Sequence, residues 1–177
     1  MVINMARQAN IYGGGALTNE HGLYFEQTTS LNDALVNQGY RLKTNGEVFN
    51  LKGVFMGYSK SKQDFIRFLD DNKVNLNVNS DTLLPDDAFI NIRNSIVYII
   101  EKKFQSVAGS VDEKLQTCLY KKQQYIKLVS QIGFEVAYTY VLNDWFSKPK
   151  YIDVLEYIKN VGCYYFFNEL PLVFLGL

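Results

Sequence analysis

Residues 85–103, PDDAFINIRNSIVYIIEKK, contain the pattern that decides the fold. Two segments, 86–90 and 95–101, have the composition of strands and flank the polar segment 91–94, which has the composition of a tight turn. The stretch therefore predicts two antiparallel strands joined by a hairpin. The second strand is apolar until it ends in Glu101, so a charged group emerges where a buried strand reaches its edge.

The register of this hairpin can be predicted from its turn. In a symmetric antiparallel hairpin the numbers of facing residues add up to a constant, and a turn centred between Arg93 and Asn94 places Asp86 opposite Glu101. Alternation puts Lys103 on the same face as Glu101 and points Lys102 to the other face. We therefore expect two carboxylates and an ammonium to meet at the sheet rim.

Such a cluster has a chemical use. Two adjacent carboxylates repel each other, and a shared Mg²⁺ relieves the repulsion. The ion can polarise a phosphodiester and activate bound water, while Lys103 orients the attacking water and offsets charge in the transition state. The residues thus predict metal-assisted phosphodiester hydrolysis by Asp86, Glu101 and Lys103. The alternative is a surface salt bridge, because carboxylate-x-Lys triplets also occur elsewhere in this chain.

Periodicity and turn signals predict the remaining elements. We expect one helix over 22–38, one that starts at Ser61, one from a capping box at Ser110 to Gly133, and one over 152–159. Strands are expected over 40–43, 48–51 and 134–142 and near Tyr164. The inner face of the Ser110 helix is predicted as Leu115, Cys118, Leu119, Tyr125, Ile126 and Val129. The unit from Ile96 to Leu142 is strand-helix-strand, which implies a parallel, right-handed crossover.

The fold class predicted is α/β, with a mixed central sheet flanked by helices. One catalytic domain is expected over 1–177, in which 1–20 is a loop segment and 143–177 adds a helix and a strand. The chain has 177 residues and is 47% hydrophobic, which excludes an intrinsically disordered protein. No apolar run reaches the length that spans a bilayer, so we expect no membrane association.

Composition also excludes several kinds of site. Cys118 and Cys163 form no CxxC pair, which argues against a zinc ribbon or a disulfide framework and for a reducing compartment. A single histidine, His21, is too few for an HNH-type or His-dependent zinc site. The glycines at 13–15 are not followed by Lys-Ser or Lys-Thr, so a phosphate-binding P-loop is unsupported.

Pro85-Asp86 followed by Glu101-Lys102-Lys103 at the end of an apolar strand resembles the PD-(D/E)XK nuclease superfamily. The resemblance implies an αβββαβ core, two acidic residues that bind Mg²⁺, and a lysine that assists hydrolysis. Segments 10–15, 22–26 and 109–115 are more specifically similar to type II restriction endonucleases. The similarity covers roughly residues 10 to 142 and is greatest to the small catalytic subunits of heterodimeric type IIS enzymes. It implies a prokaryotic, cytoplasmic protein.

Two assignments within this resemblance stay open. Asp87 could replace Asp86 as the metal ligand, because a shift of one residue in register reverses the face on which each lies. Many family members place a glutamate of the first helix at the metal, which makes Glu26 a third candidate ligand here or else a solvated helix residue.

The charge distribution bears on the partners. Lys and Arg total 18 and Asp and Glu total 18, so the chain has no net charge to attract a polyanion. Six lysines against three acidic residues fall within 101–127, where a DNA backbone would pass. Candidate DNA contacts are Gln105, Ser110, Lys114 and His21. We expect double-stranded DNA as substrate and a larger recognition subunit as partner; the alternatives are a self-sufficient homodimer and a non-catalytic subunit.

Overall fold

The computed structural model describes residues 22–25, 29–107 and 111–177. These residues form a mixed sheet in which seven strands lie side by side in the order of the chain. The strands are β1 (Arg41–Leu42), β2 (Glu47–Phe49), β3 (Phe55–Lys60), β4 (Asp87–Asn91), β5 (Ile96–Lys103), β6 (Glu135–Leu142) and β7 (Tyr164–Phe167). Neighbours from β1 to β5 are antiparallel, whereas β5, β6 and β7 are parallel. The predicted α/β class is therefore confirmed.

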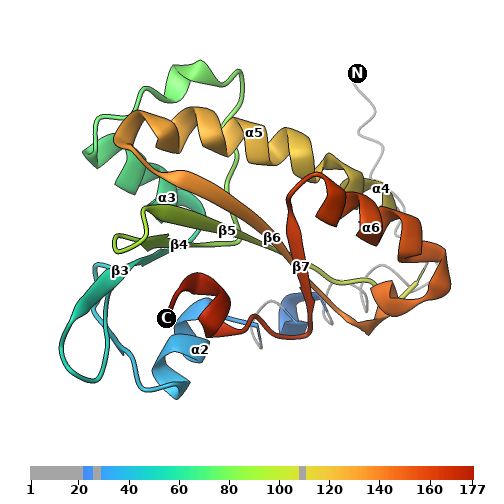
Figure 1. Ribbon diagram of the computed structural model, residues 1–177, viewed down its shortest axis with the longest axis horizontal. Helices are drawn as coiled ribbons and strands as arrows, with labels where there is room; N and C mark the ends of the chain where they lie inside the picture. The colour runs from blue at the N-terminus through green and yellow to red at the C-terminus, as the bar shows by residue number, and fades with distance from the viewer. Residues whose placement is uncertain (1–21, 26–28, 108–110) are drawn as a thin grey trace, which may run out of the picture.

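Helices cover both faces of this sheet (Figure 1). One layer holds α3 (Lys62–Asp71), α4 (Val111–Lys114), α5 (Cys118–Val129) and α6 (Ile152–Asn160). The other holds α2 (Leu31–Asn37) and the C-terminal 3₁₀ helix η6 (Leu172–Leu175). Further 3₁₀ segments are η1 (Leu76–Val78), η2 (Leu115–Thr117), η3 (Ser130–Ile132), η4 (Asp144–Ser147) and η5 (Pro149–Tyr151). None of the described helices is both long and apolar enough to cross a membrane.

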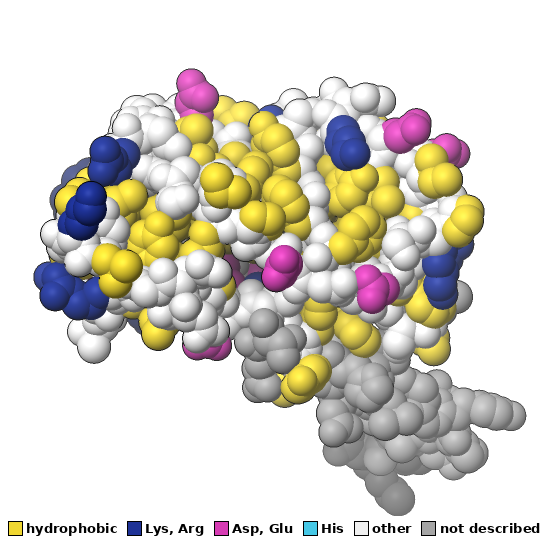
Figure 2. Space-filling view, turned by 60° about the horizontal axis from the view of Figure 1, so that its bottom comes forward, with side chains coloured by type: hydrophobic (Ala, Val, Ile, Leu, Met, Phe, Trp, Pro, Cys, Tyr) yellow, Lys and Arg dark blue, Asp and Glu magenta, His cyan; other side chains and the backbone are white. Residues whose placement is uncertain are grey.

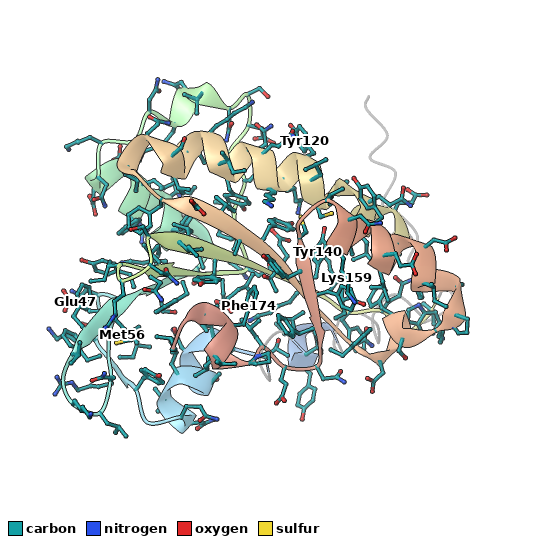
Figure 3. The ribbon with its side chains drawn as sticks, viewed as in Figure 1. Glu47, Met56, Tyr120, Tyr140, Lys159 and Phe174 are labelled. Carbon is teal, nitrogen blue, oxygen red and sulfur yellow. The ribbon has the colours of Figure 1, made fainter. Side chains whose placement is uncertain are left out.

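Two hydrophobic clusters follow from strand alternation. Val97 and Ile99 of β5 belong to the cluster beneath α3, α5 and α6, whereas Tyr98 and Ile100 belong to the cluster beneath α2 and η6. In Figure 3, Tyr140 lies on the side of the first cluster and Phe174 on the side of the second. The sheet is thus buried on both faces, which explains the nearly continuous apolar sequences of β5 and β6.

The β4–β5 hairpin has the predicted register. Asn91 pairs with Ile96 and Asp87 with Ile100, so the next position along the ladder sets Asp86 beside Glu101. The Asn91 side chain accepts hydrogen bonds from the backbone N–H groups of Arg93 and Asn94, at 2.8 and 3.3 Å, and so fixes the turn.

The strand-helix-strand unit is also confirmed. Strand β6 runs parallel to β5 in the register Glu101↔Tyr140 and Lys103↔Leu142. Gly133, with φ of 79°, ends the connecting helical segment as predicted. Because this crossover passes over the sheet, α5 packs against the strand that carries Glu101.

Several elements differ from the prediction. The helix expected over 22–38 is interrupted: residues 22–25 are helical, and α2 starts after Ser30, whose hydroxyl accepts a hydrogen bond from the N–H of Asp33. The helix expected from Ser110 changes to a 3₁₀ turn at η2 before α5 begins. Ile126, expected on the inner face, is 40% exposed, and Leu128 is buried instead.

Strand β3 was not predicted. Gly57 and Tyr58 pair with strands on both sides, and no period-2 pattern marks β3 in the sequence. The predicted loop at 1–20 lies outside the described residues.

Candidate active site

Asp86, Glu101 and Lys103 meet at the end of β5, as the sequence predicts. The Lys103 ammonium donates a hydrogen bond to Glu101 Oε2 at 2.8 Å and lies 3.7 Å from Asp86 Oδ2. The Glu101 side chain is 5% exposed and the Asp86 side chain 23%. The pair is therefore sheltered by the fold, yet open to a ligand through Asp86.

Backbone groups orient this cluster. Asp86 Oδ2 accepts a hydrogen bond of 2.7 Å from the backbone N–H of Lys102, and the Lys102 carbonyl oxygen accepts one of 3.1 Å from the Lys103 ammonium. Backbone groups of β5 thus hold both Asp86, which comes just before β4, and Lys103 of β5 itself. Their positions depend on strand pairing, not on flexible side-chain contacts alone.

Asp87 lies on the opposite face. Its Oδ2 pairs with the Lys102 ammonium at 2.7 Å and accepts a hydrogen bond from the N–H of Leu31 at 3.4 Å. Burial raises the pKa of Asp87 above 3.8, and the Lys102 charge opposes that rise. The side chain is directed away from Glu101, which favours Asp86 over Asp87 as the candidate metal ligand.

Sequence reasoning placed the lysines of α5 along a path for DNA but missed the contact of this helix with Glu101. The Lys121 ammonium lies 3.3 Å from Glu101 Oε2, so Glu101 has a lysine from β5 and a second lysine from α5. The Tyr125 and Tyr138 hydroxyls lie nearby: burial mainly, and the Glu101 charge in addition, raise the pKa of both above 10.0. The predicted crossover was the available signal, because it places α5 over β5.

The other candidate residues have different surroundings. Gln105 is buried, and its side-chain amide donates to the Val107 carbonyl oxygen at 2.8 Å. Asn143, which was not predicted, makes two hydrogen bonds with the Gln105 backbone, at 2.9 and 3.1 Å, and so fixes the chain beyond β5. Gln105 therefore shapes this segment and offers little surface to DNA.

Lys114 is exposed, and its carbonyl oxygen accepts a hydrogen bond from the Tyr140 hydroxyl at 3.2 Å. The candidate ligand Glu26 and the candidate DNA contacts His21 and Ser110 lie outside the described residues.

A cleft of about 390 Å³ adjoins Asp86. Its lining comprises Leu23, Ser30, Asp33, Ser61, Lys62, Asp86, Asp87 and Lys102. Two ammonium groups thus share the lining with three carboxylates, and Lys102 is already paired with Asp87. This mainly acidic set of charges does not favour an anionic group in the cleft.

The donor set is suited to Mg²⁺. The ion commonly takes one or two protein carboxylates and completes its shell with water and substrate oxygens. Asp86 and Glu101 supply two carboxylates around one cationic nitrogen. Within 22–25, 29–107 and 111–177 no group of three or more His, Cys, Asp or Glu side chains is placed to hold a metal. A site built from these residues would therefore rest on the two carboxylates.

Comparison with known proteins finds no matching family model, no matching curated protein and no matching solved structure.

Proposed function

We propose that this protein is a Mg²⁺-dependent DNA endonuclease, acting as the catalytic subunit of a type II restriction enzyme. The observation that carries the proposal is the convergence of Asp86, Glu101 and Lys103 at the end of β5. Two carboxylates within reach of one lysine match the requirements of metal-assisted phosphodiester hydrolysis.

The two acids and the lysine have different tasks in the proposed reaction. Asp86 and Glu101 would hold the metal, which when bound supplies charge to polarise the phosphodiester and activate water. Lys103, held by the Lys102 carbonyl oxygen, would orient the attacking water and stabilise negative charge on the phosphate. The sheltered position of Glu101 strengthens these interactions, because a low-dielectric site screens charge less than water does.

The topology supports the nuclease core that the resemblance implies. A helix, three antiparallel strands, a helix and a parallel strand can be traced through α2, β3, β4, β5, α5 and β6, with α3 inserted between β3 and β4. The additional hairpin β1–β2 and the strand β7 extend the sheet at its two edges.

The contacts that the lysines near the site already make favour a partner protein that supplies the affinity for DNA. Lys102 pairs with Asp87, Lys103 and Lys121 pair with Glu101, and Lys122 donates to the Gly162 carbonyl oxygen. Of the six lysines within 101–127, four are therefore already engaged in the protein. Little of the local positive surplus is available for phosphates.

An apolar surface could receive such a partner. Val36 on α2, Tyr164 on β7 and Val173 on η6 are 55%, 45% and 78% exposed. Figure 2 shows the face that bears α2 and η6, with hydrophobic side chains over its middle and Lys and Arg mostly towards its ends. Exposed apolar patches on soluble proteins often mark interaction sites.

The test is cleavage of plasmid DNA by the purified protein with Mg²⁺, with and without a co-encoded larger protein. We expect cleavage when both proteins are present and none after chelation of the metal. Cleavage by the chain alone would favour a self-sufficient homodimer. No cleavage under any condition would favour the non-catalytic subunit. Undiminished cleavage by Lys103→Ala would contradict the proposed mechanism.

A further inference from the structure

Glu101 is the most heavily neutralised acid of the candidate site. Its Oε2 atom lies 2.8 Å from the Lys103 ammonium and 3.3 Å from the Lys121 ammonium. Asp86, in contrast, lies 3.7 Å from Lys103. Two carboxylates and two ammonium groups thus form a cluster with no formal charge before any metal is added.

The two lysines are held differently. Lys103 belongs to the same strand as Glu101, donates to the Lys102 carbonyl oxygen, and has a side chain 17% exposed. Lys121 reaches the site from α5, and its side chain is 27% exposed. Lys121 is therefore closer to solvent and is carried by an element that does not hold the acids.

A divalent cation at Glu101 would repel an ammonium at this position. Both would lie beside the same carboxylate, and the 5% exposure of that side chain leaves little water to screen them. Lys121 can relieve the repulsion by moving towards solvent. Lys103 also lies 3.7 Å from Asp86 Oδ2 and can pair with that carboxylate within the cluster.

We propose that Lys121 is a built-in competitor of the metal: it neutralises Glu101 in the metal-free protein and must leave Glu101 when a divalent cation binds. This inference rests on the proposed function, since it concerns the same acidic pair. The released ammonium then faces solvent beside the site, where a DNA phosphate can accept it. Lys121 thereby makes metal binding weaker in the absence of DNA.

Calorimetric titration with Mg²⁺ alone, without DNA, tests the competition. Lys121→Met keeps the aliphatic stem and removes the charge, whereas Lys121→Arg keeps the charge. We expect Lys121→Met to bind Mg²⁺ about tenfold more tightly than the wild type. Lys121→Arg and the matched control Lys127→Met, an exposed position on the same helix, should stay within about twofold.

The outcomes separate this inference from the proposed function. The variant Asp86→Asn, which lacks one of the two carboxylates, tests the metal site itself. If Lys121→Met binds Mg²⁺ no more tightly than the wild type, while Asp86→Asn does not bind it, the competition is overturned and the metal site stays in place. Absence of Mg²⁺ binding in the wild type and in every variant would overturn both the competition and the proposed metal-dependent function. If Lys121→Met fails to fold, Lys121→Gln provides the same comparison, and thermal unfolding with and without Mg²⁺ gives an independent measure of binding.

Discussion

Asp86 and Asp87 are neighbours in sequence but belong to opposite faces of the sheet. Asp86 joins Glu101 and Lys103, whereas Asp87 is enclosed with Lys102 beneath α2. The Lys102 and Asp87 side chains are 6% and 16% exposed, so their ion pair is largely buried. One acid is therefore available for chemistry and the other is part of the structure.

The pKa of Asp87 predicts a pH effect on stability. A carboxyl whose pKa is higher in the folded than in the unfolded protein stabilises the fold below the unfolded pKa, and this contribution is lost as pH rises through the folded pKa. We expect the stability of the wild type relative to Asp87→Asn, measured by urea unfolding, to fall as pH rises from the unfolded pKa of about 3.9 through the higher folded pKa. A relative stability that increases with pH would mean that the Lys102 charge outweighs the burial of Asp87.

The residues of the site differ in how far the sequence could reveal them. Hairpin symmetry was enough to place Asp86 beside Glu101, because strand pairing couples residues at fixed offsets. Lys121 meets Glu101 through packing of α5 on the sheet, and no local pattern encodes that contact. Gln105 was expected at the surface, yet its side chain turns inward to the Val107 carbonyl oxygen.

At the scale of elements, β3 depends on a glycine. Gly57 has φ of 150°, and a Cβ at this position would overlap the Ile90 carbonyl oxygen of β4. We expect Gly57→Ala to lower the free energy of unfolding by about 2–3 kcal/mol, measured by urea denaturation. Gly53→Ala is the matched control: its φ is 75° and its surroundings are open, so a loss of about 1 kcal/mol is expected. Equal losses would show that close packing at Gly57 contributes nothing.

The C-terminal segment is a second stabilising element. Leu175 of η6 is fully buried, and its carbonyl oxygen accepts a hydrogen bond of 2.8 Å from the Asn91 side chain at the β4–β5 turn. We expect Leu175→Ala to cost about 3 kcal/mol in thermal or urea unfolding. Val173→Ala, on the same 3₁₀ helix but 78% exposed, should change stability by less than about 0.5 kcal/mol. Comparable effects of the two variants would contradict the packing of η6 on the sheet.

Elements were predictable where local chemistry and burial agree. The two strands expected over 40–43 and 48–51, the apolar strand β5 and the end of the helical segment at Gly133 all formed as expected. Gly46, in the turn between the first two strands, and Gly133 both have positive φ. The break before α2 had a signal in Ser30, three residues before Asp33, that helical periodicity obscured. Strand β3 had none, because its neighbours β2 and β4 determine its burial.

At the scale of the whole molecule, charge governs the expected affinity for DNA. The chain has no net charge, and most lysines near the acidic pair already have partners in the protein. We therefore expect the chain alone to bind a duplex with a Kd weaker than about 10⁻⁵ M at physiological salt, measured by fluorescence anisotropy. Tight binding by the isolated chain would remove the reason to propose a recognition subunit.

The central claim is that Asp86, Glu101 and Lys103 together cleave DNA, and the rate of cleavage by Lys103→Met tests it most directly. The measurement compares single-turnover plasmid cleavage by the wild type, Lys103→Met and Lys127→Met, each with Mg²⁺ and the larger partner. We predict a loss of at least about 100-fold for Lys103→Met, because its ammonium would act on the reacting phosphate, and an unchanged rate for Lys127→Met. Cleavage by folded Lys103→Met at the wild-type rate would contradict the claim.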